Sequence, residues 1–96
     1  MHTISIKSNS PEAVIPLLQN AIDREKRILT ESLRVTKQKL ANMSSKLSVD
    51  PDKLMRGEIE HTDANDMDLI ELEGEVQMLH HLEAELKELE SLEICS

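Results

Sequence analysis

The chain has 96 residues, a formal net charge of −8 and no Phe, Tyr or Trp. A chain of this length forms one small domain, and its core has to be built from Leu, Ile, Val and Met. The acidic surplus argues against a direct nucleic acid ligand, which requires a basic face. No segment approaches the roughly 20 apolar residues of a membrane helix. We therefore expect a soluble cytoplasmic protein that binds neither membrane nor nucleic acid.

The charges divide the chain into two unlike halves. Eight basic and four acidic residues precede Ser48, whereas three basic and fifteen acidic residues follow from that position onward. Because both halves also carry apolar residues at helical spacing, the simplest interpretation is two helices of opposite charge that lie side by side. The acidic surplus that remains favours a basic protein as an outside partner.

The first long helix is predicted over residues 10–47. Ser10 followed by Pro11 is a typical helix start, with a capping residue before a proline at the first helical position. Pro16 lacks the N–H group that the second turn requires, so we expect a distorted opening turn before the regular helix. Apolar residues then recur at steps of three, four and seven, as in a coiled-coil seam. The seam consists of Ile22, Leu29, Leu33, Thr36, Leu40, Met43 and Leu47.

Two shorter elements flank this helix in the sequence. Residues 2–7, HTISIK, alternate apolar and polar side chains, a pattern that permits a short strand. Asp50 before Pro51 repeats the cap and proline start, so residues 51–56 are predicted as a short helix that ends at Gly57. Leu54 and Met55 of this short helix are expected to close the open end of a helical hairpin.

The second long helix is predicted over residues 66–92. Its apolar stripe drifts around the helix, and such drift either follows a left-handed crossing or makes a face wide enough for two neighbours. Gly74 interrupts the pattern and indicates a close approach of another backbone. The stripe consists of Leu69, Leu72, Val76, Leu79, Leu82, Leu86 and Leu89.

Residues 57–75 hold eight acidic residues and no Lys or Arg. Asp63 and Asn65 begin a calcium-loop pattern, but Met67 occupies the next alternate position and no glycine follows where the loop requires it. A catalytic pair of carboxylates would need one desolvated member, and the stretch offers no aromatic or basic neighbour for that purpose. A helix N-terminus accounts better for the three aspartates of this stretch. They are Asp63, Asp66 and Asp68.

His80 and His81 do not match a metal site. Zinc hydrolases place two histidines four residues apart, and di-iron bundles place a Glu three residues before a His, where this chain has Gln77 and Met78. His81 and Glu85, four residues apart, are expected to form a solvated surface pair. We expect no catalytic residue, no metal and no cofactor.

The chain resembles small all-α antitoxin-like proteins of archaea and bacteria that are often encoded beside a putative toxin. The resemblance spans residues 10–92, through LLQNAI, RILTESLRVTKQKL, KLSVDPDKLMRGEIE and the acidic last helix. Its motif is a capped aspartate cluster and then Glu71, Leu72, Glu73 and Gly74. It implies a helical hairpin that associates with itself or with a toxin, and it implies no catalytic residues.

The expected fold class is all-α. Residues 1–96 would form a single domain, a long antiparallel helical hairpin with a short connecting helix. Apolar surface that one hairpin cannot cover predicts a homodimer in the form of a four-helix bundle. Leu40 is expected to be among the most buried residues. The dimer interface is predicted at Ile28, Val35, Leu79, Leu82 and Leu86.

Two functions remain open from the sequence. The first is a non-catalytic protein-binding module, the antitoxin-like partner of a basic toxin protein. The second is a structural, self-assembling helical bundle or coiled-coil scaffold. For the first function, carboxylates would attract the partner and apolar residues would hold it. The predicted partner-binding residues are Asp63, Asp66, Asp68, Glu71, Leu72, Glu75 and Met78.

Overall fold

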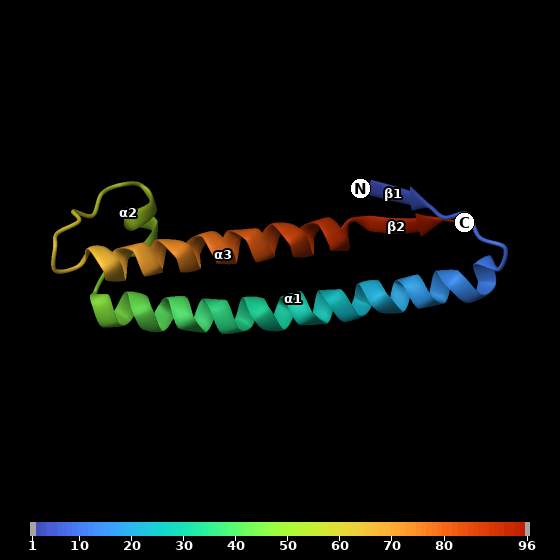
Figure 1. Ribbon diagram of the computed structural model, residues 1–96, viewed down its shortest axis with the longest axis horizontal. Helices are drawn as coiled ribbons and strands as arrows, with labels where there is room; N and C mark the ends of the chain where they lie inside the picture. Colours follow the sequence, from blue (N-terminus) through green and yellow to red (C-terminus); the bar gives the residue numbers. More distant parts are fainter. Residues whose placement is uncertain (1, 96) are drawn as a thin grey trace.

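The protein is mostly helical. The computed structural model describes the backbone of residues 2–95 and the side chains of residues 3–92. Two long helices, α1 (Pro11–Leu47) and α3 (Asp66–Glu90), pack against each other. The chain runs along α1 in one direction and returns along α3 (Figure 1). The predicted positions of both long helices are confirmed to within two residues.

Helix α1 begins directly after Ser10, as predicted. The backbone carbonyl of Ser10 accepts the first hydrogen bonds of the helix, but its side chain makes no capping bond. The helix continues without interruption through Pro16, so it already begins five residues before that proline. A proline at this position removes only one hydrogen bond near the helix end, the one to the carbonyl of Glu12.

In the segment from α1 to α3, the helices begin and end close to the predicted start and stop residues. Ser48 ends α1 with a left-handed conformation at a φ of 55°. The Asp50 carboxylate accepts a hydrogen bond from the N–H of Asp52 at 2.9 Å and caps the short helix α2 (Pro51–Met55). Gly57 follows with a φ of 76°, a conformation that favours glycine. Helix α2 thus ends one residue earlier than the predicted range of 51–56.

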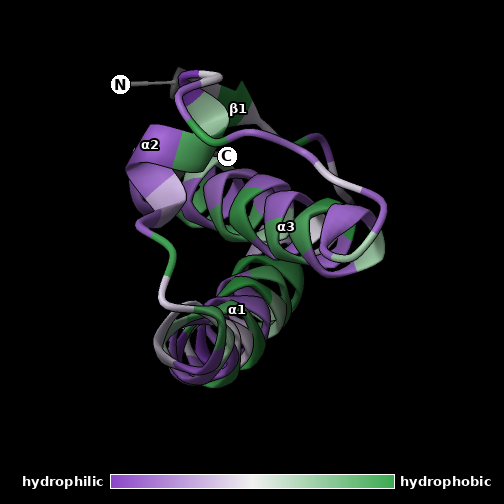
Figure 2. Ribbon diagram, turned by 90° about the vertical axis from the view of Figure 1, so that its left-hand side faces the viewer, coloured by the Kyte–Doolittle hydropathy of each residue, from purple (hydrophilic) through white to green (hydrophobic). Residues whose placement is uncertain are grey.

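The best-buried part of the core lies at the α2 end of the molecule. Leu54 of α2 and Leu69 and Leu72 of α3 retain 3%, 1% and 0% of their accessible surface. Viewed along the long helices, α2 lies beside α3 (Figure 2). Leu54 therefore closes this end, as predicted, whereas the same prediction for Met55 is wrong because that side chain is 40% exposed. Partly buried apolar residues surround the cluster: Leu40, Met43, Leu47, Val49 and Ile59.

Leu40 is not among the most buried residues, so that prediction is wrong. The buried side chains of α1 lie further toward its N-terminus, at Leu29, Leu33 and Thr36. Val76 is their buried counterpart near the middle of α3. These four residues confirm the predicted seams on both helices. Leu40 lies instead at the edge of the α2 cluster, where its side chain remains partly exposed.

The molecule is thin and elongated. It measures 62 × 20 × 17 Å and has a radius of gyration of 19.1 Å, whereas a compact chain of this length has about 12.5 Å. Two helices side by side cannot enclose their apolar residues on every side. Hydrophobic residues accordingly lie on outward faces of both long helices as well as between them (Figure 2).

A short parallel ladder modifies the all-α prediction. Strand β1 (His2–Ser5) pairs with β2 (Leu92–Cys95), with His2 opposite Leu92 and Ser5 opposite Cys95. The alternation seen in HTISIK therefore does mark a strand. The predicted helix over 66–92 ends at Glu90 because the backbone beyond Ser91 is paired with β1.

Candidate protein-interaction surface

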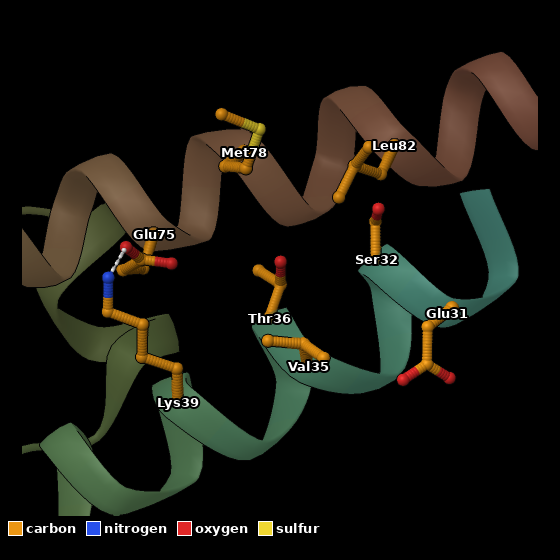
Figure 3. A pocket seen from close by; sticks show the side chains of 8 residues that line it. All are labelled: Glu31, Ser32, Val35, Thr36, Lys39, Glu75, Met78 and Leu82. Carbon is orange, nitrogen blue, oxygen red and sulfur yellow. Dashed lines mark ion pairs between the residues drawn. The ribbon is translucent and has the colours of Figure 1, made fainter. Parts of the chain in front are cut away.

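A groove runs between α1 and α3 near their middle. Its volume is about 460 Å³. The side chains of Ser32 and Thr36 point toward α3, and Leu82 points back toward α1 (Figure 3). Val35 and Met78 also line the groove, although 48% and 50% of their surfaces remain exposed. The two helices therefore leave apolar side chains accessible between them.

Two smaller hollows continue this groove along the same side of the helix pair. On α1, the three hollows are lined by residues spaced seven apart, at positions 25, 32, 39 and 46. On α3, they are lined by residues at steps of four and three, at positions 71, 75, 78, 82, 85 and 89. Such spacings keep residues on one side of a helix. We refer to this side, defined by these ten residues together with Leu29 and Val35, which line the same hollows, as the open side.

An ion pair crosses the open side at the groove. Nζ of Lys39 lies 2.8 Å from Oε1 of Glu75 (Figure 3). The hydrogen bond to Glu75, together with the attraction of its negative charge, raises the pKa of the Lys39 ammonium above its ordinary value. The pair joins the basic half of the chain to the acidic half, in agreement with the predicted arrangement of two oppositely charged helices.

The groove is bordered on α1 by a second ion pair. Glu31 and Arg34 form a bidentate ion pair, with 2.6 Å between Nη2 of Arg34 and Oε1 of Glu31. The hydrogen bond from Arg34 lowers the pKa of the Glu31 carboxyl. The Glu31 side chain points away from α3 (Figure 3), and it is 62% exposed. Its charge is therefore directed outward from the groove.

The hollow furthest from α2 is lined by apolar and acidic residues. It has a volume of about 320 Å³ and is lined by Leu29 and Leu89 together with Glu25, Glu85 and Glu88. No Lys or Arg is among its lining residues. The region therefore combines an apolar surface with negative charge. We call it the far hollow.

His61 connects the acidic loop before α3 to that helix. Nδ1 of His61 lies 2.8 Å from Oδ1 of Asp66, and Nε2 lies 3.3 Å from Oε1 of Glu73. The hydrogen bond with Asp66, aided by the negative charges of Glu73 and Asp66, raises the pKa of His61 above its ordinary value of 6.5, against a smaller lowering by burial. The ring thereby connects the α2–α3 loop to two successive turns of α3.

Only some of the predicted partner-binding residues are accessible. Asp63, Asp68 and Glu71 are exposed, and none of them takes part in an ion pair among the described residues. Asp66 and Glu75 are already paired, with His61 and Lys39. Leu72 is fully buried in the α2 cluster, so its predicted contact with a partner is wrong. Its position in the core depends on α2, which packs over this face of α3. Met78 is half exposed beside the groove.

Gly74 does not mark a close approach within the chain, contrary to prediction. It is exposed, and a Cβ atom built on it would meet nothing within 4 Å. Its exposed neighbours on the same outer face are Met67 and Ile70, seven and four residues earlier, with 72% and 50% of their surfaces exposed. Sequence reasoning missed this outer face because the leucine stripe dominated the pattern.

The predicted dimer residues fall into two groups. Ile28 and Val35 of α1 are about half exposed, whereas Leu79, Leu82 and Leu86 of α3 are partly buried. Only Val35 and Leu82 line the central groove. The far hollow, with Glu25, Leu29 and Leu89, was not predicted as a site. The seven-residue spacing from residue 25 to residue 46 is the signal that could have revealed it.

No protein-family model, curated protein or solved structure matches this chain. Within residues 3–92, no three His, Cys, Asp or Glu side chains lie in an arrangement that could hold a metal ion. In the same described part, neither long helix combines the length and apolar character of a membrane span. The features that the described residues do provide are an apolar groove, a charged rim and exposed carboxylates, which suit contact with another protein.

Proposed function

We propose that this chain is a non-catalytic protein-binding module that acts in the cytoplasm as the antitoxin-like partner of a basic toxin protein. The observation that carries the proposal is the open side, where Val35, Met78 and Leu82 form an accessible apolar strip. A partner on this side would bury the strip and would neutralise the carboxylates at its rim. Apolar burial and charge complementarity are the two contributions that a protein interface requires.

The exposed area of the chain is larger than that of a compact monomer, which supports the proposal that a partner covers part of it. The chain exposes 7081 Å², whereas a compact monomer of the same mass exposes about 5,600 Å². The excess of about 1,500 Å² is about twice the roughly 800 Å² that each partner buries in a standard protein interface. A bound protein would therefore remove about half of this excess.

The exposed carboxylates near α2 supply the expected attraction. In the described part of the chain, Asp63, Asp68 and Glu71 have no recorded ion pair that would offset their charge. Exposed charges act over a screening length of about 8 Å at physiological salt. These residues would therefore accelerate the encounter with a basic protein, while apolar contacts would determine how long the complex lasts.

Surface plasmon resonance against the product of the adjacent gene tests the proposal. We expect binding with an association rate that falls as salt concentration rises. The variant D63K/D68K/E71K should associate more slowly and with a flatter salt dependence, while its helical content is unchanged. Binding without salt dependence, or no binding at tens of micromolar, would contradict the proposed function.

A second candidate is the structural, self-assembling bundle. Ile28 and Val35, exposed by 51% and 48% on the same helix, favour this alternative because isolated hairpins rarely leave such residues uncovered. Two antiparallel hairpins would then form a homodimeric four-helix bundle through the predicted interface residues. Sedimentation equilibrium should give twice the chain mass of 10.9 kDa, and a single species at the chain mass would exclude this candidate.

A further inference from the structure

The open side has the form of a site for one additional helix. We propose that it binds a single amphipathic helix of a basic partner and so completes a three-helix bundle. This inference rests on the proposed function, and it names the kind of partner segment and its binding site. Three features of the open side support this partner: its apolar strip, the charge along its rim, and the difference between its two ends.

The apolar strip fits the side chains of a helix. Val35 lies on the α1 wall of the groove, and Met78 and Leu82 lie on the α3 wall. A helix laid between two others inserts its own apolar residues into such a groove, at spacings of three and four. The α3 residues that border the open side follow the same three and four spacing. The partner should therefore present an apolar stripe with that repeat.

The charges along the rim select a basic helix. At the α2 end, Lys46 lies with Asp68 and Glu71 around one hollow, so the two signs are mixed. In the far hollow the charged lining residues are all acidic, with Glu25 and Glu85 on opposite helices. Electrostatic complementarity therefore requires positive charge on the partner, concentrated toward the far hollow.

The far hollow also suits the shape of a basic side chain. Lys and Arg lay their apolar stems on hydrophobic surface and keep the charged group at a polar rim. Leu29 and Leu89 provide apolar lining, and Glu25 and Glu85 line the same hollow from opposite helices. The Glu85 carboxylate also lies 2.8 Å from Nε2 of His81, the surface pair expected from the sequence. One basic side chain in this hollow would fix the direction in which the partner helix lies.

A second copy of this chain is a poorer occupant of the open side. Each copy carries a net charge of −8, so two copies repel each other as whole molecules even though the first half of each chain is basic. Like charges that face each other across an interface disfavour association. A basic helix meets the same apolar strip without that repulsion.

A synthetic helix serves as the probe. It is a fluorescein-labelled peptide of about 20 residues, which spans about 30 Å as a helix, with Leu at spacings of three and four and Lys elsewhere. Fluorescence anisotropy with the full chain should show saturable binding. Two matched peptides should bind at least about tenfold more weakly. One replaces Lys with Glu, and the other has the same composition without the helical repeat.

Paired variants locate the probe on the surface. V35D should weaken binding about tenfold because it places a charge in the apolar strip. I70D is its control, since Ile70 is equally exposed on the outer face of α3. E25K/E85K should weaken binding about tenfold and flatten its salt dependence, whereas D23K/E83K makes the same charge change at exposed positions outside the open side. Circular dichroism checks that all four variants remain helical.

Several outcomes would overturn the inference. These are no binding of the Lys peptide at about 100 μM, equal binding of the Lys and Glu peptides, and equal effects of V35D and I70D. A stable dimer that V35D converts to monomers would assign the open side to a second copy. If the adjacent gene product binds but the peptide does not, the inference fails and the proposed function stands. If neither binds, both fail.

Discussion

Lys39 of α1 and Glu75 of α3 form an ion pair across the open side, with 2.8 Å between Nζ of Lys39 and Oε1 of Glu75. The Lys39 side chain is 61% exposed and that of Glu75 is 21% exposed. Lys39 has three donors, so it can bind Glu75 and still interact with another group. The pair thus links the two helices across the groove, and its two opposite charges offset each other.

A double-mutant cycle with K39M and E75Q should detect a small favourable coupling between these residues. Exposed pairs contribute little because water and salt screen the charges. The coupling, measured by urea denaturation, should therefore decrease as salt concentration increases. K37M is a matched control, since Lys37 is an exposed lysine of the same helix. A coupling that grows with salt would contradict the electrostatic origin of the contact.

The two glycines should respond oppositely to alanine. Gly74 lies within α3 with open space where a Cβ would stand, so Gly74→Ala should stabilise the protein by about 0.5 to 1 kcal/mol. Gly57 has a φ of 76°, so Gly57→Ala should destabilise it by about 1 kcal/mol. Chemical denaturation measures both changes. A loss of stability on Gly74→Ala would mean that α3 has a close neighbour in solution.

Leu72→Ala should be among the most destabilising substitutions. Leu72 is completely buried, and its truncation should cost about 2 to 5 kcal/mol because a cavity remains. Leu40→Ala should cost less because that side chain is already partly exposed. Gln38→Ala, at an exposed site, should cost almost nothing. Denaturation midpoints in any other order would place the core elsewhere along the helix pair.

The His61 contacts should make the α2–α3 loop sensitive to pH. Because the folded-state pKa of His61 is raised, the protonated ring is favoured in the folded protein. Its stabilising contribution should be complete below the ordinary pKa of 6.5 and should disappear as pH rises through the raised pKa. In a proton NMR titration, the His61 ring should show a midpoint above 6.5. A midpoint at or below 6.5 would show that the Asp66 and Glu73 contacts do not persist.

A variant pair assigns that pH dependence to one residue. H61Q should abolish the loss of stability that accompanies the rise in pH above 6.5. H80Q should preserve that loss, because His80 is exposed on α3 and the ion pairs recorded among the described residues do not involve it. Thermal unfolding at a series of pH values compares the two variants. An identical response of both would assign the effect to another group.

Local signals predicted the helix boundaries well. A proline after Ser10 and after Asp50 sets the first residue of α1 and of α2, because proline is accommodated where its missing N–H is not needed. The seven-residue repeat likewise predicted the buried seam at Leu29, Leu33 and Thr36. These features depend on residues close together in sequence, and such residues can be interpreted without a tertiary structure.

Features that depend on distant neighbours were not predictable in the same way. Leu72 and Leu40 lie in similar patterns, and their different burial is determined by where α2 packs. Strand β2 has only four residues, and its partner β1 lies at the other end of the chain. Among the candidate site residues, the sequence correctly suggested exposed carboxylates. It could not show which of them would be neutralised by partners such as His61 and Lys39.

The ladder between β1 and β2 determines the order in which the protein folds. His2 and Leu92 are opposite each other, so forming this pair requires the chain to close a loop of about ninety residues. Closing such a loop costs conformational entropy before any contact compensates for it. Helices α1 and α3 reduce that cost, because their packing brings the chain ends together before the strands meet. We therefore expect the ladder to form after α1 and α3 have packed and to open when the helix pair separates.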